Sequence, residues 1–144
     1  MRIAVDFDGT IVEHKYPSIG KEKPFAVETL KQLNADGHNL ILWTVRSGDL
    51  LHEAVQWCAD RGLKFYAVNS NKPQGSLFAS FPDGSPKVSA DIFIDDSNLG
   101  GIPDWGEIYA LVSGKEKSMK HRRSHRSHRS WLSRLFWGKR KRHF

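Results

Sequence analysis

The sequence has a single cysteine, Cys58, and no apolar run close to the roughly 20 residues that a membrane-spanning helix needs. One cysteine excludes a disulfide within the chain and is typical of a reducing compartment, so we expect a cytoplasmic protein. Asp6 and Asp8 interrupt the first apolar run, and we therefore expect no signal peptide. These shortages argue against disulfide-rich secreted domains and membrane-embedded proteins.

Acidic residues are nearly absent from residues 113–144, which contain Glu116 alone against 12 Lys and Arg, a net charge of +11. Residues 1–112 instead contain 10 Lys and Arg against 15 Asp and Glu, a net charge of −5. With 144 residues, 39% of them hydrophobic, the chain is long enough to bury one ordinary core. The sequence therefore predicts one folded domain over 1–112 and a basic tail over 113–144, and the charge asymmetry concerns the partners of the tail, not the fold.

Apolar runs and helical patterns alternate along residues 1–112. Buried strands are expected at 2–6, 39–44, 63–68 and 90–95, and helices at 24–35, between 47 and 62, and at 104–112. This alternation predicts an α/β fold with a parallel, Rossmann-like sheet and helices on both faces, which makes three layers. Right-handed crossovers place the first strand near the centre of the sheet, between the second and the fourth.

Two acids, Asp6 and Asp8, directly follow the first predicted strand, and Gly9 then allows the chain to turn. Side chains two residues apart in an extended chain point the same way, so we expect the two carboxylates to share a pocket. Like charges in one pocket repel, and a bound cation is the usual remedy. Hard oxygen ligands suit Mg²⁺, which is therefore the expected ion.

Polar side chains also follow two other predicted strands. Thr44 and Arg46 follow the second strand, and Asp95 and Asp96 end the fourth. Ligands of open α/β sheets bind beyond the carboxyl ends of the strands, so these residues are expected to meet the first two acids at one edge. An arginine in the position of Arg46 is more often a surface or salt-bridging residue than a substrate contact.

The DFDGT motif at 6–10, the strand-terminal Thr44 and the IDD motif at 94–96 together resemble the haloacid dehalogenase superfamily of phosphohydrolases. The resemblance covers residues 1–112. It implies a Mg²⁺-dependent phosphomonoester hydrolase that acts through an aspartyl-phosphate intermediate. Its phosphorylated substrate is either a small molecule or a macromolecule, and the sequence does not choose between them.

The resemblance also implies a role for each motif residue. Asp6 is the nucleophile, and Asp8 is the acid/base that protonates the leaving alcohol and later activates water. The implied catalytic residues are Asp6, Asp8, Thr44 and Lys87. The implied phosphate-binding residues are Asp8, Gly9, Thr44 and Lys87. The implied Mg²⁺ site consists of Asp6, Asp8 through its carbonyl, Asp95, and Asp96 through a metal-bound water.

The phosphate-neutralising lysine has two candidates. Lys87 is favoured because it lies just before the fourth strand, eight residues from Asp95. Lys72, in the loop after the third strand, is the alternative, and either residue is also compatible with a solvated loop lysine.

Two loops, 10–23 and 69–87, occupy the places where larger members of the superfamily insert a cap domain. Both are too short for a folded domain, so the chain resembles the capless members and an open site is expected. Tyr16 and its loop are a candidate partial lid.

The basic tail lies outside the resemblance. Residues 121–130 contain no core-forming residue and are expected to be disordered alone, whereas 131–136 has the spacing of a partly amphipathic helix. Three uses of the tail stay open: nucleic-acid binding, contact with an anionic membrane, and a solubilising extension that packs on the core or on another subunit of a homo-oligomer. The competing function is a non-catalytic module that binds nucleic acid or membrane through this tail. Phosphotransfer to an acceptor other than water would use the same site residues.

Overall fold

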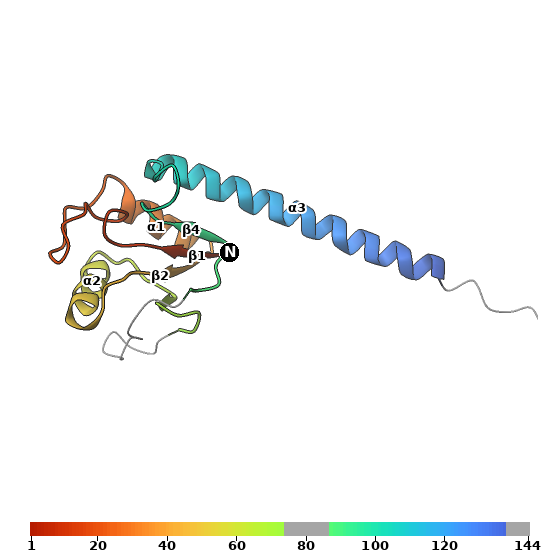
Figure 1. Ribbon diagram of the computed structural model, residues 1–144. Coiled ribbons are helices and arrows are strands. Elements are labelled where there is room, and N and C mark those ends of the chain that lie inside the picture. Colours follow the sequence, from red (N-terminus) through yellow and green to blue (C-terminus); the bar gives the residue numbers. More distant parts are fainter. Residues whose placement is uncertain (74–86, 138–144) are drawn as a thin grey trace, which may run out of the picture. The chain divides into compact units, whose positions relative to one another are not determined.

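The computed structural model describes the backbone of residues 1–73 and 87–137, and side chains as far as His121. Its elements are β1 (Arg2–Val5), α1 (Ala26–Ala35), β2 (Asn39–Leu42), α2 (Gly48–Asp60), β3 (Ala67–Val68), β4 (Ile92–Ile94) and α3 (Trp105–Trp137). The four strands form one parallel sheet in the order β3-β2-β1-β4 (Figure 1). The predicted α/β class and the central place of the first strand are confirmed.

The central strand β1 has a hydrogen-bonded neighbour on each side and is buried on both faces, because consecutive side chains of a strand point to opposite faces and Ile3, Ala4 and Val5 are all buried. Residues 3–5 pair with residues 40–42 of β2 and with residues 92–94 of β4. Residues 3–5 and 40–42 are all at most 1% exposed. A parallel strand enclosed in this way reads as a continuous apolar run, which is why the sequence located β1 and β2 within two residues of their ends.

Helix α1, which follows β1, and helix α2, which follows β2, each bury one apolar face. The buried residues of α1 are Ala26, Val27, Leu30 and Leu33, and those of α2 are Leu51, Ala54, Val55 and Cys58. Cys58 is buried as a small apolar residue, and burial raises the pKa of its thiol to about 12. The expectation that α1 begins at Pro24 is wrong, because Phe25 adopts a φ of 63° and is 72% exposed.

The third strand, expected over 63–68, is only two residues long. Leu63 is buried, but the ladder to β2 begins with the bond from the Tyr66 N–H to the Leu40 carbonyl. Asn69 then takes a positive φ of 47°, which ends the extended conformation. Of the predicted run, only Leu63, Ala67 and Val68 are buried, and hydrogen bonding to β2 confines the strand to its last two residues.

The last helix is much longer than expected. The sequence predicts an end at Val112 and disorder over 121–130, but α3 continues to Trp137. Helical hydrogen bonds are local and need no core, so a run without core-forming residues still adopts this conformation. The chain divides into two compact units, Met1–Tyr109 and Ala110–Phe144. Within the described part of the chain, no helix combines the length and the apolar character needed to cross a membrane.

Candidate active site

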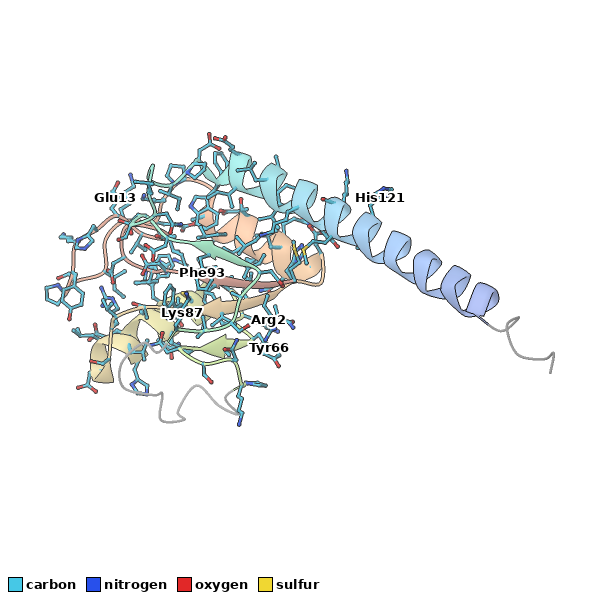
Figure 2. All side chains as sticks on the ribbon, turned by 45° about the vertical axis from the view of Figure 1, so that its right-hand side comes forward. Arg2, Glu13, Tyr66, Lys87, Phe93 and His121 are labelled. Carbon is cyan, nitrogen blue, oxygen red and sulfur yellow. The ribbon has the colours of Figure 1, made fainter. Side chains whose placement is uncertain are left out.

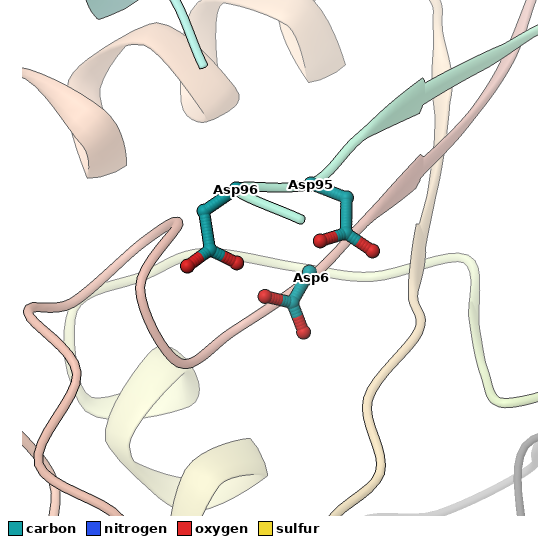
Figure 3. Close-up of side chains that lie close together, drawn as sticks. All are labelled: Asp6, Asp95 and Asp96. Carbon is teal, nitrogen blue, oxygen red and sulfur yellow. The ribbon is translucent and has the colours of Figure 1, made fainter. Parts of the chain in front are cut away.

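Three carboxyl groups meet at the carboxyl ends of the neighbouring strands β1 and β4. The Asp6 N–H donates to the Ile94 carbonyl at 2.9 Å, which extends the β1–β4 ladder by one step and brings Asp6 beside Asp95. One carboxylate oxygen each from Asp6, Asp95 and Asp96 lies within 4.8 Å of the others, and Figure 3 shows the three groups turned toward a common space. The convergence that the sequence predicts for these three residues is present.

Thr10 joins two of these acids. Its hydroxyl donates to Asp6 Oδ2 at 3.0 Å and accepts the Asp96 N–H at 3.0 Å. The indole N–H of Trp105, at the start of α3, donates to the Thr10 carbonyl at 3.3 Å, and Thr10 is completely buried. Our sequence reasoning assigned Thr10 no role, although its place as the last residue of the DFDGT motif was the available signal.

Gly9 is where the backbone passes closest to the acidic group. Its φ is +83°, and a Cβ on Gly9 would lie 2.1 Å from Asp96 Oδ2. Only glycine fits this conformation beside that carboxylate. The Gly9 N–H, expected to bind a phosphoryl oxygen, donates instead to the Val12 carbonyl at 2.8 Å. Gly9 thus serves the turn and the placement of Asp96 in this structure.

The surroundings of Asp6 disfavour its charged form. Burial has the largest effect, followed by repulsion from Asp95, and together they raise the pKa of Asp6 from 3.8 to about 7. The hydrogen bonds from the Phe7 N–H and the Thr10 hydroxyl oppose this rise only in part. Near neutral pH the site therefore carries more negative charge than its protein neighbours neutralise, which is a condition that a cation relieves.

The raised pKa of Asp6 predicts a pH-dependent stability. Between pH 4 and pH 7 the folded protein holds the Asp6 proton and the unfolded chain releases it, so stability falls as the pH rises through this window. In chelator, the melting temperature of the native protein should fall relative to that of Asp6→Asn between pH 4 and pH 8. Thermal scans of both proteins across this range test the prediction, and parallel curves would contradict it.

Asp8 does not join the three acids. Its two carboxylate oxygens accept N–H groups from Arg46, at 2.6 Å from Nε and 2.7 Å from Nη2. The Asp8 carboxylate is not among the three whose oxygens lie within 4.8 Å of one another, and β1 ends at Val5, so the alternation of an extended strand does not continue to Asp8. The expectation that Asp6 and Asp8 share one pocket stays a prediction. The buried guanidinium of Arg46 neutralises the charge of Asp8 in a salt bridge. Arg46 is therefore a salt-bridging arginine, as the sequence favoured.

Thr44 lies two residues beyond β2 and is 2% exposed. Its hydroxyl accepts the Arg46 N–H at 3.2 Å, and its own N–H donates to Asn69 Oδ1 at 2.9 Å. Asn69 is fully buried, and its Nδ2 has no hydrogen-bond partner in the part of the chain that the structure describes. Our sequence reasoning placed Asn69 in an irregular loop, although an Asn directly after a strand was a signal for a left-handed residue.

The two candidate lysines are both exposed. Lys87 is labelled in Figure 2, and the next residue, Val88, packs in a buried cluster with Ala4 and Ile41. The N–H of Lys72 donates to the Ser70 hydroxyl at 3.0 Å. Across residues 1–73 and 87–121, no ion pair joins either lysine to the three acids. The preference for Lys87 stays a prediction.

Comparisons with known proteins relate the chain to a solved structure. No family model matches the chain, and no curated protein matches it. The chain is similar to a solved structure described as a conserved protein coded by a locus from Bacteroides thetaiotaomicron, with 59% identity, a TM-score of 0.70, and coverage of 80% of this chain and 91% of that chain. This chain belongs to the same family as that protein. The relative's description names no activity, so the functional argument depends on the site.

Proposed function

We propose that the protein is a Mg²⁺-dependent phosphatase of the haloacid dehalogenase type that hydrolyses phosphate monoesters through an aspartyl phosphate on Asp6. The observation that carries the proposal is the group formed by Asp6, Asp95 and Asp96, whose carboxylate oxygens lie within 4.8 Å of one another. The proposed architecture has helices on both faces of the sheet and no cap domain. Such an open site admits small phosphate esters and macromolecular phosphates alike.

The donor set suits a hard divalent cation. Three carboxylates in close proximity offer oxygen ligands only, which Mg²⁺ prefers, and the pKa of Asp6 is raised first by burial and then by repulsion from Asp95, both of which a bound cation would offset. Asp6, Asp95 and Asp96 would hold the ion, together with the carbonyl of Asp8. When bound, Mg²⁺ would screen the repulsion between an anionic nucleophile and an anionic phosphate.

The protein's own residues then have distinct tasks. Asp6 forms a bond to phosphorus while the bond from phosphorus to the ester oxygen breaks. Asp8, which enters this step in its protonated form, gives its proton to the leaving oxygen and becomes a carboxylate paired with Arg46; it later takes a proton from the water that attacks the aspartyl phosphate, which frees Asp6 and phosphate and restores the protonated form. Each Asp8 oxygen accepts one N–H from Arg46 and keeps a second lone pair for this proton transfer.

The phosphoryl group needs donors beside the acids. We assign this task to the hydroxyl of Thr44 and to the ammonium of Lys87, with Lys72 as the alternative cation. In support of this assignment, Thr44 follows β2 at the edge of the sheet where the acids lie, and Val88, the residue after Lys87, packs with Ala4 and Ile41 of the two central strands. Neutralisation of the three equatorial oxygens is the main requirement of phosphoryl transfer, since little covalent chemistry is left to the protein beyond the nucleophile.

Hydrolysis of an aryl phosphate tests the proposal directly. The native protein should release phosphate from p-nitrophenyl phosphate in Mg²⁺, and chelation followed by gel filtration should lower the rate at least about 100-fold, because the charges on Asp6 and phosphate then stay unscreened. Adding Mg²⁺ back should restore the rate. Absence of turnover, together with absence of Mg²⁺ binding by calorimetry, would overturn the proposal.

In that case the basic helix becomes the place to look for function. The helix α3 includes the basic residues of 113–137, and a basic helix suits a module that binds nucleic acid or an anionic membrane, which is the alternative function. Transfer of the phosphoryl group to an alcohol instead of water is a third outcome. It would appear as a new phosphate ester when glycerol is added to the assay.

A further inference from the structure

Tyr16 is an exposed aromatic side chain next to the buried Asp8–Arg46 pair. It is 49% exposed, and Arg46 Cζ lies over its ring, 5.2 Å from the centroid. The guanidinium therefore covers part of one face of the ring, while the remainder is open to solvent. A cation over an aromatic face is attractive and fixes the orientation of the ring.

Arg46 also holds the backbone on which Tyr16 sits. Its Nη1 donates to the Pro17 carbonyl at 3.1 Å, and its Nη2 donates to the Ser18 carbonyl at 3.0 Å. On its inner side the guanidinium lies 5.3 Å from the ring centroid of Phe7, a core residue. Because these contacts order the segment 16–18 before any ligand binds, a ligand that packs on Tyr16 loses little free energy in ordering it.

The same guanidinium forks onto both oxygens of Asp8, the group proposed to meet the leaving oxygen of the substrate. Tyr16 is thus one side chain removed from the place where the organic part of a phosphate ester must lie. We propose that Tyr16 is a specificity residue that selects phosphate monoesters whose organic group is a planar aromatic or heteroaromatic ring. This inference rests on the proposed function, since Asp8 marks the leaving-group side only if it transfers that proton.

Stacking on Tyr16 should affect binding of the organic group and leave the phosphoryl chemistry alone. Tyr16 is not one of the three acids that would hold the metal, and removing its ring takes away no charged group. Tyr16→Ala should therefore raise KM for phenyl phosphate about tenfold, the size of a typical aromatic stacking contribution, with kcat changed by less than about threefold. KM for glycerol phosphate and inhibition by inorganic phosphate should stay the same.

Tyr66 provides a matched control, because it is 40% exposed but lies directly before β3. Figure 2 shows it near Arg2, which begins β1, whereas Asp6 follows the last residue of that strand. Tyr66→Ala should leave both substrates unaffected. Tyr16→Phe should behave like the native protein, because it keeps the ring and loses only the hydroxyl. Equal changes in KM for the two substrates, or the same effect from Tyr66→Ala, would overturn the inference.

Calorimetry on Asp6→Asn separates this inference from the proposed function, since that protein should bind esters without consuming them. Phenyl phosphate should bind to Asp6→Asn about tenfold more tightly than to the double variant with Tyr16→Ala, and glycerol phosphate should bind to both equally. Failure of hydrolysis with this binding difference retained would reject the phosphatase and keep the aromatic subsite. Hydrolysis by the native protein without the binding difference would reject the subsite alone.

Discussion

Asp6→Asn is expected to hydrolyse an aryl phosphate at least about 10³-fold more slowly than the native protein, because a carboxamide does not form the proposed aspartyl phosphate. The side chains are nearly isosteric, and the Asn oxygen can still accept the Thr10 hydroxyl. Burial and repulsion from Asp95 disfavour the anionic form of Asp6 and raise its pKa to about 7. In chelator at pH 8 the inactive variant should therefore melt at a higher temperature than the native protein.

This combination of lost activity and gained stability distinguishes a nucleophile from a structural residue. If Asp6 had only a structural role, the Asp6→Asn variant would lose both activity and stability. Asp91→Asn is the control, because Asp91 is an acid just before β4 whose Oδ2 accepts the Arg2 N–H at 2.8 Å, outside the group of three. It should retain activity within about threefold. Activity of Asp6→Asn within tenfold of native would refute the nucleophile assignment.

Gly9→Ala is expected to destabilise the protein by about 2–5 kcal/mol, the sum of a left-handed backbone and an overpacked contact. The added Cβ would lie 2.1 Å from Asp96 Oδ2, and the φ of +83° is unfavourable for alanine. Because relief of the contact must move Asp96, the variant should also bind Mg²⁺ at least about tenfold more weakly. Urea denaturation and metal titration by calorimetry measure the two effects.

Gly37→Ala is a close match for the backbone part of this change. Gly37 has a φ of +86°, and a Cβ added there meets nothing within 4 Å. It should lose only the about 1–2 kcal/mol of left-handed strain, with Mg²⁺ binding unaffected. The difference between the two variants isolates the contact with Asp96. Equal losses of stability with equal metal affinity would mean that Gly9 serves the turn alone.

Particular elements show how far the sequence predicts the fold. The apolar runs of β1 and β2 identified strands that are buried on both sides, and parallel order followed from the helices between them. The ends of elements were less predictable, because single backbone conformations decide them. Phe25 and Asn69, at φ values of 63° and 47°, delay α1 and end β3, and neither conformation has a clear periodic signal.

The candidate site divides in the same way. Asp6, Asp95 and Asp96 could be placed together from sequence, because they lie within two residues of the ends of β1 and β4, and adjacent parallel strands end at the same edge. Arg46 was also expected at this edge, since it follows β2, and it meets Asp8 there; that its fork would take both oxygens of Asp8 was not predictable, because this pairing joins side chains 38 residues apart. Thr10 was missed because its hydroxyl bridges Asp6 to the backbone of Asp96, across 86 residues.

The sequence by itself determined the α/β class, because each buried strand is an apolar run that can be recognised locally. It also determined that three acids gather at one edge of the sheet, because these acids lie at the ends of two such runs. The tertiary structure decided which acids repel one another as neighbouring carboxylates and which are neutralised by a cationic side chain. Asp8 pairs with a buried guanidinium, and Asp6 is left among carboxylates with a raised pKa. That division depends on which distant side chains pack together, because electrostatic energies are set by distances and burial that no local pattern records.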